Sequence, residues 1–583
     1  MHAFRVWAPL PKKVEVQVGS ERHAMIPEPD GWWSAEVATA GVGDRYGFVL
    51  DGEGPFPDPR SSSQPQGVHE LSQLTDPDSY VWSDDQWQPP PLASAILYEL
   101  HLGTFTPEGT FLSAIAKLDH LVALGVTHVE LMPVVEFSGD RGWGYDGVDL
   151  FAPHHAYGAP SDLKKLVDAC HERGLGAILD VVYNHLGPSG NYLAKYAPYF
   201  SRRYAPTWGE ALNYDGAESD HVRRFFCDNA LRWLRDFHFD GLRLDAVHAI
   251  YDFSAQPLLE QLKLEVERLS GQLGRPLFLI AESDLNDPRL LWPRERGGFA
   301  LDAQWSDDFH HALHCVLTGE KTGYYADFGK LQDLAAALHQ AFVYDGKFSA
   351  HRRRRHGRPA GNLSGHRFLA YLQNHDQIGN RAQGERSNHL LSLGKVKIGA
   401  ALVLTSPFVP LLFQGEEWGA SAPFLYFTDF PETELAESVR AGRCREFAAF
   451  GWNPDSIPNP QAPESFARSK LNWAELSNAP HYLLLDWYQR LIRLRQAEPL
   501  LHDGKLESVQ THFDEVERWL VMERAAITVA CNLADHPQYI PLRVGEHRSL
   551  LAFEPGVNVL NGSVNLPPES VAILKLERTS IDA

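Results

Sequence analysis

Short apolar runs, each closed by a polar or charged residue, recur through the middle of the chain. Eight of them are long enough for buried strands, and the stretches between them carry apolar residues at the spacing of an amphipathic helix. The runs occupy residues 96–100, 126–134, 175–184, 241–245, 276–282, 299–305, 368–374 and 409–415. Strands that alternate with helices predict an α/β fold, and eight of them favour a closed (β/α)8 TIM barrel over an open sheet.

The helices between these runs are predicted from apolar positions that repeat every three or four residues. The first helix should bury Ile115, Leu118 and Val122 on one face. The second should begin at a Ser161 cap, because a serine hydroxyl accepts a hydrogen bond from the free amides of a first turn. The buried faces expected for the second and third helices are Leu163, Leu166, Val167 and Cys170, and then Val222, Phe225, Phe226, Trp233 and Phe237.

The two ends of the chain have a different pattern, because apolar and polar residues alternate there over short stretches. Alternation with a period of two indicates half-buried strands. We therefore expect an N-terminal β-sandwich over residues 1–92, the barrel over 93–495 and a C-terminal β-sandwich over 496–583. Two long insertions in the barrel, at about 186–218 and 306–366, should lie at its catalytic mouth.

Three carboxylates close predicted barrel strands: Asp245 in GLRLDAVH, Glu282 in LFLIAES and Asp376 in LAYLQNHD. The carboxyl ends of all strands of such a barrel meet at one mouth, so residues far apart in the chain can form one site. Two carboxyl groups, one ionised and one protonated, are what hydrolysis of a glycosidic bond needs. The apolar strand that leads to Glu282 should raise its pKa and keep its proton, which suits a general acid.

Other polar groups also close these strands. Arg243 precedes Asp245 by two residues and faces the same way, so its charge can keep Asp245 ionised. His185 and His375 end two further strands. Two histidines with carboxylates could alternatively bind a metal. No HExxH or HxH spacing occurs, however, and the sequence predicts neither a metal site nor a cofactor.

The composition narrows the range of partners. The formal net charge is −22, which argues against nucleic acid and anionic membranes. The five cysteines are widely spaced without a CxxC pair, and the first residues lack the basic and apolar regions of a signal peptide. No run of about 18 apolar residues could span a bilayer. These features predict a cytoplasmic protein without a disulfide framework.

Four segments, DVVYNH, GLRLDAVH, the AES strand end and QNHD, resemble the four ordered motifs of the α-amylase family of glycoside hydrolases. The resemblance covers about residues 94–490, and the flanking β domains match the layout of multidomain members, whose N-terminal domain resembles a carbohydrate-binding module. It implies a retaining mechanism in which Asp245 is the nucleophile, Glu282 the general acid and base, and Asp376 the stabiliser of the transition state. The residues implied to line the subsite of the attacked sugar are Arg243, His185, His375 and Tyr145.

Within this family, AESDLNDPR, WSDDFHHALH and TGYYADFG look most like the malto-oligosyltrehalose trehalohydrolases. That resemblance implies hydrolysis of the α-1,4 bond next to the terminal trehalose unit of malto-oligosyltrehalose. It also implies a functional link to the synthase that makes this substrate. Recognition of trehalose must come from loops, and the candidates are Asp307, Asp308 and Phe309 after the sixth strand, followed by Trp305, Tyr324, Tyr325 and Glu417.

Two other functions remain open from the sequence. A branching or debranching enzyme would use the same catalytic trio, and its N-terminal sandwich and GWGYDG segment would look similar. A non-catalytic glucan-binding protein is the other alternative, and the intact trio argues against it. The basic run HRRRRHGR at 351–358 is interpreted as a solvated loop rather than a site for polyanions.

Overall fold

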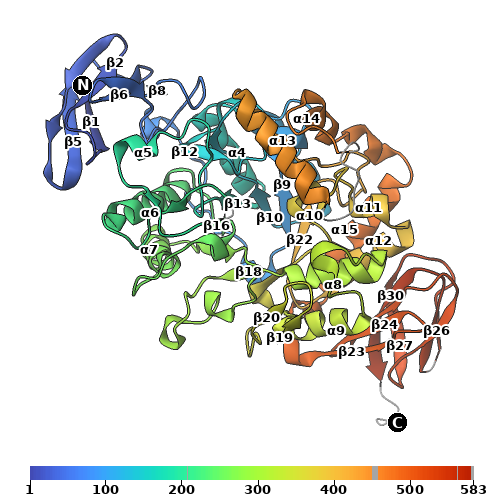
Figure 1. The fold of residues 1–583 in the computed structure, drawn as a ribbon. Helices are drawn as coiled ribbons and strands as arrows, with labels where there is room; N and C mark the ends of the chain where they lie inside the picture. The colour runs from blue at the N-terminus through green and yellow to red at the C-terminus, as the bar shows by residue number, and fades with distance from the viewer. Residues whose placement is uncertain (207, 449–456, 561, 579–583) are drawn as a thin grey trace.

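The computed structural model describes residues 1–206, 208–448, 457–560 and 562–578. All eight predicted runs form strands of one closed parallel barrel, in the order of the chain, and β22 pairs with β9 to close it. The strands are β9 (Leu97–Leu100), β10 (His128–Leu131), β13 (Gly176–Val181), β16 (Gly241–Leu244), β17 (Phe278–Ala281), β18 (Ala303–Trp305), β21 (Phe368–Ala370) and β22 (Val409–Phe413). The predicted TIM barrel is confirmed. In Figure 1 it lies between the N-terminal domain at upper left and the C-terminal domain at lower right.

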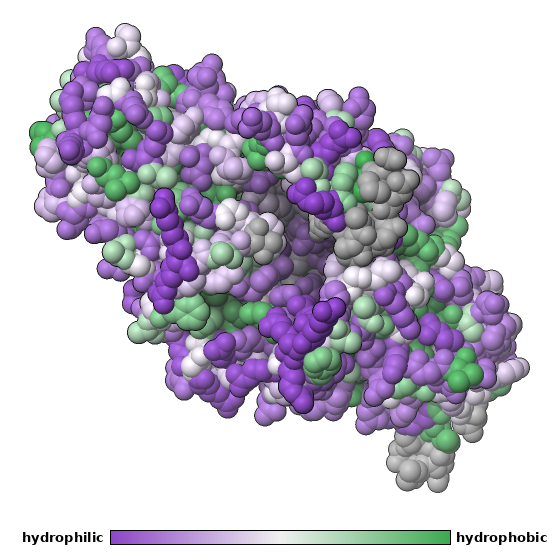
Figure 2. Space-filling view, viewed as in Figure 1, coloured by the Kyte–Doolittle hydropathy of each residue, from purple (hydrophilic) through white to green (hydrophobic). Residues whose placement is uncertain are grey.

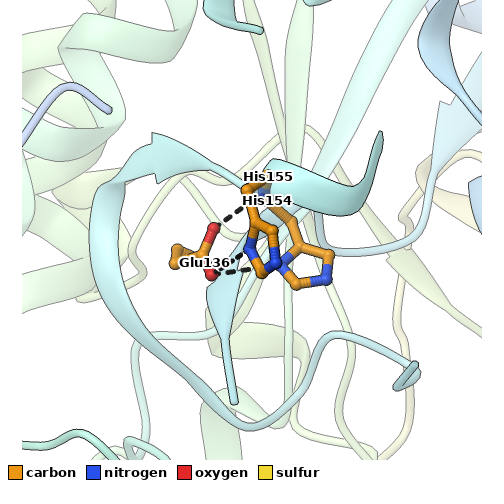
Figure 3. Close-up of side chains that lie close together, drawn as sticks. All are labelled: Glu136, His154 and His155. Atoms are coloured by element: carbon orange, nitrogen blue, oxygen red, sulfur yellow. Dashed lines mark hydrogen bonds and ion pairs between the residues drawn. The ribbon is translucent and has the colours of Figure 1, made fainter. Parts of the chain in front are cut away.

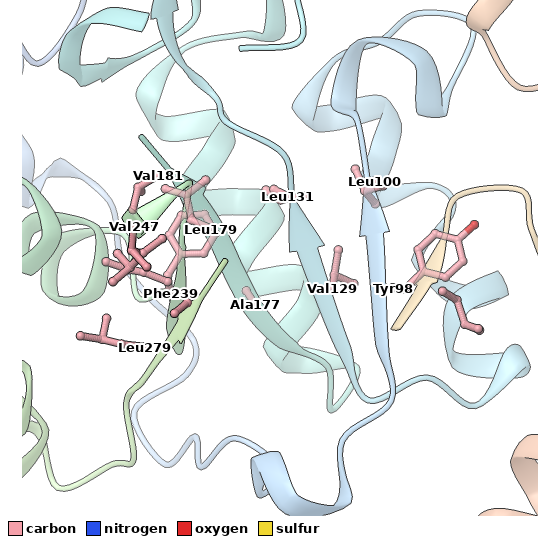
Figure 4. Close-up of a cluster of buried hydrophobic side chains, with 14 of the residues drawn as sticks. Tyr98, Leu100, Val129, Leu131, Ala177, Leu179, Val181, Phe239, Val247 and Leu279 are labelled. Atoms are coloured by element: carbon pink, nitrogen blue, oxygen red, sulfur yellow. The ribbon is translucent and has the colours of Figure 1, made fainter. Parts of the chain in front are cut away.

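Successive residues of each barrel strand point alternately towards the helices and towards the barrel axis. Leu179 belongs to the apolar cluster between strands and helices (Figure 4), whereas its neighbour Ile178 belongs to a separate cluster inside the barrel. The same alternation directs Glu99, Asp180 and Arg243 inward, and all three are buried. The sequence therefore places charged groups inside the barrel, next to its mouth.

Helices cover the outside of the barrel (Figure 1). The longer ones are α4 (Pro160–Glu172), α6 (Ser219–Asp236), α7 (Leu258–Leu273), α8 (Asp307–Thr318), α9 (Leu331–Gln340), α12 (Leu393–Thr405), α13 (Thr433–Ala448) and α15 (His481–Ala497). The shorter ones are α1 (Leu102–Phe105), α2 (Phe111–Ile115), α3 (Leu118–Leu124), α5 (Leu193–Tyr196), α10 (His375–Gly379), α11 (Ser387–Leu390) and α14 (Pro463–Ser469). The connection from β17 to β18 departs from strict alternation, because the two 3-10 turns η6 (Pro288–Leu290) and η7 (Arg294–Arg296) stand there instead of an α-helix.

Two predictions about helices are wrong in detail. Leu118 is buried as predicted, but Val122 is 43% exposed, because the first helix breaks after α2 and its continuation α3 buries Leu121 and Leu124 in place of Val122. Ser161 is not the cap of α4, which begins one residue earlier at Pro160. The fixed φ of proline suits the first helical position. The buried faces predicted for α4 and α6 are confirmed.

The N-terminal domain consists of two antiparallel sheets, and Phe4, Val16 and Phe48 contribute to the core from three of its strands. One sheet contains β1 (His2–Trp7), β5 (Trp32–Val37) and β4 (Ile26–Pro27). The other contains β3 (Glu21–Ala24), β2 (Val14–Val18), β6 (Arg45–Leu50), β7 (Glu53–Phe56) and β8 (Ser72–Gln73). The predicted β-rich domain at this end is confirmed.

The C-terminal domain is also built from two antiparallel sheets, and Val521, Ile540 and Val564 share its apolar cluster. The larger sheet contains β23 (Val509–Asp514), β24 (Trp519–Arg524), β25 (Ile527–Asn532), β30 (Ser570–Arg578) and β27 (Glu546–Ala552). The smaller sheet contains β26 (Gln538–Pro541), β29 (Ser563–Leu566) and β28 (Asn558–Leu560). The β-rich domain predicted here is confirmed as well.

The two predicted insertions contain structure of their own. The first holds α5 and the short pair β14 (Phe200–Ser201) and β15 (Ala211–Leu212), and the second holds α8, α9 and the hairpin of β19 (Asp345–Ser349) and β20 (Arg354–Gly357). The basic run is therefore part of a hairpin and not a simple loop. Most of its side chains are exposed as expected, but Arg352 forms an ion pair with Asp284 at 3.0 Å.

The surface is predominantly hydrophilic, and Figure 2 shows a hollow near the middle of the face that carries α10 in Figure 1. Among the described residues, no helix is long and apolar enough to cross a membrane.

Candidate active site

Asp245 and Glu282 are each the first residue after a barrel strand, and these two strands, β16 and β17, are paired in parallel. Both carboxylates contact one guanidinium: Arg243 Nη1 lies 2.8 Å from Asp245 Oδ1, and Arg243 Nη2 lies 3.4 Å from Glu282 Oε2. Their side chains are 13% and 14% exposed. The structure thus brings the two predicted catalytic carboxylates together, with access to solvent.

Arg243 is fixed from below by the inner face of the barrel. Its side chain is fully buried, its Nη1 donates to Asp180 Oδ2 at 2.7 Å, and its Cζ lies 4.3 Å from the ring centroid of Trp305. A planar guanidinium on an aromatic face with bonds to two carboxylates has little freedom to turn. Arg243 therefore fixes the positions of both carboxylates.

Two further contacts orient the carboxylates. Asn184 Nδ2 donates to Asp245 Oδ2 at 2.7 Å. Ala246, the residue after Asp245, has a φ of 39°, in the left-handed region that a side chain rarely adopts. Its backbone N–H donates to Glu282 Oε2. Backbone strain of this kind persists where the surrounding structure enforces it, and here it joins the two strand ends.

Asp376 reaches the site from a different kind of element than expected. It lies in the first turn of α10, whose N-cap Asn374 accepts hydrogen bonds from the backbone of Asp376 and Gln377. The Asp376 side chain is 42% exposed, and its Oδ1 lies 3.6 Å from His375 Nε2. The cap fixes the backbone of Asp376 while its carboxylate faces the open mouth.

His375 and Tyr145 line one side of the site. Their rings stack with centroids 5.1 Å apart, and His375 Nε2 lies 2.8 Å from the hydroxyl of Tyr145. Burial opposes protonation of His375, but the charges of Glu99 and Asp376 outweigh it and raise its pKa to about 9. The protonated ring donates to Tyr145, and Tyr145 donates to Asp180 at 2.6 Å. A continuous hydrogen-bonded chain therefore connects this wall to Arg243.

The pKa of Glu282 lies well above its ordinary value. Burial is the largest cause, and the charges of Asp245, Asp376 and Asp307 add to it, whereas Arg243 acts in the opposite direction. A carboxyl group that keeps its proton can donate it to the leaving oxygen of a glycosidic bond. This electrostatic asymmetry suits the acid role for Glu282.

Several predicted binding residues lie around these groups. Trp305 supports Arg243 from below, and the hydroxyl of Tyr371 donates to Asp307, whose pKa is raised to about 6 by burial and by Asp284 and Asp376. His185 is partly exposed with its ring 5.9 Å from that of Trp208. Tyr324 is partly exposed. Burial raises the pKa of its hydroxyl, and the charge of Asp376 adds to this effect.

Other predicted binding residues are placed elsewhere. Asp308 Oδ2 accepts hydrogen bonds from Asn286 and from the backbone of Val343 and Tyr344, so it holds a loop together. The residues with buried packing roles are Phe309, whose ring packs on Phe408; Tyr325, whose hydroxyl lies 3.0 Å from His310 Nε2; and Glu417, which accepts from Tyr98 and lies 2.8 Å from His120 Nε2. Their side chains belong to the interior and not to the mouth.

Sequence reasoning missed Glu99, Asp180 and Asn184. The signal was present, because Glu99 and Asp180 are charged residues within otherwise apolar strands. A buried charge needs a partner, and these two hold His375 and Arg243. Asp284 was also missed, although it follows Glu282 by two residues and binds Arg352.

The metal alternative finds no support at this mouth. Within the described ranges, the ligand atoms of Glu136, His154 and His155 converge closely enough to bind an ion, and these residues lie on another element.

Comparisons with known proteins agree with this fold. Residues 75–206 match the family model described as alpha amylase, catalytic domain, and residues 504–573 match a domain of unknown function. A malto-oligosyltrehalose trehalohydrolase from Mycobacterium tuberculosis (strain ATCC 25618 / H37Rv) is 49% identical over 581 residues, which cover 99% of each chain. The protein of that name from Rhizobium sp. (strain M-11) is 48% identical over 98% of this chain and 97% of its own.

Solved structures show the same architecture. A Salmonella typhimurium protein described as an alpha amylase has a TM-score of 0.90 and 39% identity, with 98% of this chain and 97% of that chain covered. A pullulanase from Paenibacillus barengoltzii, at 19% identity and a TM-score of 0.72, shares the fold.

The closed barrel and its paired carboxylates define a glycoside hydrolase of the α-amylase class. The relatives narrow this class further. At 49% identity over nearly its whole length, the chain belongs to the family of malto-oligosyltrehalose trehalohydrolases.

Proposed function

We propose that the barrel mouth performs a retaining double displacement, with Asp245 as nucleophile, Glu282 as general acid and base, and Asp376 as stabiliser of the transition state. The chain hydrolyses malto-oligosyltrehalose, at the α-1,4 bond next to its terminal trehalose unit. The observation that supports these roles is the guanidinium of Arg243, which contacts both Asp245 and Glu282.

In the first step Glu282 gives its proton to the glycosidic oxygen while Asp245 attacks the anomeric carbon. The bond to the aglycone breaks, trehalose leaves, and a glycosyl-enzyme forms on Asp245. In the second step the Glu282 carboxylate takes a proton from water, whose oxygen attacks the same carbon and releases the malto-oligosaccharide. Asp245 then returns to its ionised state beside Arg243.

The remaining wall residues position the sugar and its neighbour. Tyr145 presents its ring, and His375, Arg243 and His185 supply polar contacts to the sugar that is attacked. We assign recognition of the trehalose side to Asp307 and Tyr324, whereas the buried Trp305 supports Arg243 and has a structural role. The buried contacts of Asp308, Phe309, Tyr325 and Glu417 support a structural role for those four side chains.

Product analysis tests the substrate and the reaction together. Incubation with maltotriosyl-trehalose should release trehalose and maltotriose, and incubation with amylose should give no new α-1,6 branches. New branches without free trehalose would replace this proposal with a branching enzyme. Binding of both glucans without any product would replace it with a non-catalytic binding protein.

The catalytic roles are tested by substitution. Glu282→Gln should lower turnover of maltotriosyl-trehalose by about 10²–10⁴-fold, because it cannot donate the proton. Asp245→Asn should lose turnover by several orders of magnitude and still bind the oligosaccharide in calorimetry. Asp78→Asn, at an exposed position of the N-terminal part, is the control and should keep normal turnover. Near-normal turnover of Asp245→Asn would exclude Asp245 as the nucleophile.

The setting of the reaction is proposed on separate grounds. We place it in the cytoplasm, because all five cysteines are free thiols, as in reducing compartments. The substrate must come from a synthase that converts the reducing end of a malto-oligosaccharide into a trehalose unit. Fractionation of the source cells, with the activity assayed in each fraction, tests the location.

A further inference from the structure

Three potential metal ligands converge at the base of a hairpin outside the active site. The hairpin is formed by β11 (Val135–Phe137) and β12 (Gly147–Pro153), and Figure 3 shows the Glu136 carboxylate facing the rings of His154 and His155. Glu136 Oε1 lies 2.7 Å from His155 Nδ1 and 3.3 Å from His154 Nδ1. The ligand atoms of the three residues all lie within 4.8 Å of one another.

His154 is buried without satisfying its ring. Its exposure is 0%, and among the described residues neither of its ring nitrogens has a hydrogen bond of normal geometry. The ring is held in place by Phe137, which stacks on it with centroids 3.7 Å apart, and by the edge of Tyr157 at 4.9 Å. A buried polar group without a hydrogen bond is costly. A cation between the imidazole of His154 and the carboxylate of Glu136 would give this ring a partner.

The surroundings of His155 match those of a metal ligand. Its Nδ1 faces Glu136, and its Nε2 lies 3.2 Å from Asp140 Oδ1 on the opposite side of the ring. Metal-bound histidines commonly donate their other N–H to a carboxylate, which fixes the tautomer and strengthens the ligand. Glu136 is itself oriented, because its Oε2 accepts the backbone N–H of His155 at 2.8 Å.

We propose that Glu136 Oε1, His154 Nδ1 and His155 Nδ1 bind one zinc ion or a similar first-row divalent metal. Zinc takes imidazole nitrogens and carboxylate oxygens at about 2.0–2.2 Å, so two such ligands of one tetrahedron lie about 3.3 Å apart. The Glu136–His154 separation already has this value, and the Glu136–His155 contact would widen slightly. Water completes the tetrahedron.

The site has an entry path and a structural purpose. His155 is partly exposed and lines the crevice between the N-terminal domain and α4, so an ion can reach it from solvent. The metal would link the two strand ends of the hairpin, and the segment between those strands carries Tyr145 of the active-site wall. Its main effect is therefore on the stability of the hairpin and not on the chemical step.

Metal titration of the full chain tests this site. After dialysis against a chelator, calorimetric titration with Zn²⁺ should show one saturable site, and the melting temperature should rise with Zn²⁺ concentration, as for any ligand of the native state. Co²⁺ in place of Zn²⁺ should give the visible absorption of a tetrahedral centre. Asp140→Asn should weaken the affinity by about 10–100-fold, because it removes the carboxylate behind His155.

The variants decide the assignment. His154→Gln and, in case that variant fails to fold, the partly exposed His155→Gln should each abolish the stoichiometric site. His69→Gln is the matched control, because His69 is a nearby histidine bonded to Tyr192 and outside the cluster, and it should leave the titration unchanged. No saturable binding by the unaltered chain, or binding that survives in the folded His155→Gln variant, would overturn the proposal in favour of a metal-free hydrogen-bond cluster.

Discussion

At the residue scale, the two proposed catalytic carboxylates differ in how closely they contact the guanidinium of Arg243. Arg243 Nη1 lies at hydrogen-bonding distance from Asp245, whereas Nη2 is farther from Glu282. Burial and three neighbouring carboxylates raise the pKa of Glu282 despite Arg243. Since the proposed general acid Glu282 must be protonated, kcat/KM should fall as the pH rises through the pKa of Glu282.

The negative charge of Asp307 raises the pKa of Glu282, so a substitution of Asp307 should change the pH profile. Asp307 has a pKa raised to about 6, so it is ionised in neutral and alkaline solution. Asp307→Asn removes a negative charge and makes ionisation of Glu282 easier. The alkaline limb of the kcat/KM profile should therefore move to lower pH, as measured with maltotriosyl-trehalose across the alkaline range.

The control for this shift is Asp345→Asn, which changes a partly exposed carboxylate of the same insertion and should leave the alkaline limb in place. A limb that stays fixed or moves to higher pH in Asp307→Asn would show that Asp307 does not act on Glu282.

The positions of the proposed catalytic carboxylates could be predicted from sequence more reliably than those of the side chains proposed to recognise trehalose. Asp245 and Glu282 follow buried strands directly, and the alternation of a strand fixes their direction. Phe309 and Glu417 lie on a helix turn and in a loop, where direction depends on packing partners far away in the chain. The ring of Phe309 packs on Phe408, and Glu417 accepts a hydrogen bond from Tyr98. No local sequence pattern predicts either contact.

At the element scale, the segment that joins the N-terminal domain to the barrel is anchored by charge and aromatic stacking. Asp84 lies 2.7 Å from His171 Nδ1 and 2.9 Å from His238 Nδ1. Trp82 stacks on His238 at 3.7 Å, and Trp87 stacks on His171 at 4.4 Å. Four neighbouring side-chain contacts thus fix the segment that contains Trp82, Asp84 and Trp87.

The stability of this anchor should depend on pH. Burial opposes the ionisation of Asp84, but hydrogen bonds from His171 and His238 outweigh it and keep its pKa well below the ordinary 3.8. Burial likewise opposes protonation of His171, and Asp240 and Asp84 raise its pKa above the ordinary 6.5. The depressed group contributes stability above pH 3.8 and the raised group contributes below pH 6.5, so both contribute fully only between these values.

Asp84→Asn should therefore lower the free energy of unfolding by about 3 kcal/mol at pH 6, because it removes one of the two carboxylates that pair with the buried charge of His171. The difference should shrink in alkaline solution above the raised pKa of His171, where this side chain has lost its proton in the parent chain. Thermal unfolding at both pH values measures it. Asp85→Asn, at the exposed neighbouring position, should have no effect at either pH, and an equal loss for Asp84→Asn at both would contradict the ion-pair explanation.

Element positions were predictable where the apolar pattern is long and continuous, as for all eight barrel strands and for α6. They were less so where the chain breaks a helix. The interruption between α2 and α3 changes which side of the helix meets the barrel, and Leu121 rather than Val122 becomes buried. A break of two residues carries no periodic signal, so its effect on the buried face appears only in three dimensions.

At the scale of the whole molecule, the C-terminal domain binds to the barrel through buried hydrogen bonds. Arg524 of β24 donates to the carbonyls of Thr405 at 2.6 Å and Ser406 at 2.8 Å, and Arg495 of α15 donates to those of Leu404 and Phe408. The last carbonyls of a helix have no partners within it. These two arginines therefore supply the missing donors at the end of α12, just before β22.

Arg524→Met should lower the stability of the protein by about 1–3 kcal/mol, because it leaves the carbonyl of Thr405 without the Arg524 donor. A lower melting temperature with unchanged circular dichroism at 25 °C would show it. Arg548→Met is the control, since Arg548 is largely exposed and paired with Glu577 on the same domain, and it should change the melting temperature little. Equal effects of the two substitutions would argue against the capping role.

The seam of the barrel sets the timing of its assembly on the ribosome. Leu97 of the first strand pairs with Leu411 of the last, which is synthesised roughly 300 residues later. At about 5–20 residues per second this interval is about 15–60 s. During that time the outer edge of β9 has no neighbour on one side, and the nascent polypeptide must be protected from intermolecular association until translation reaches β22.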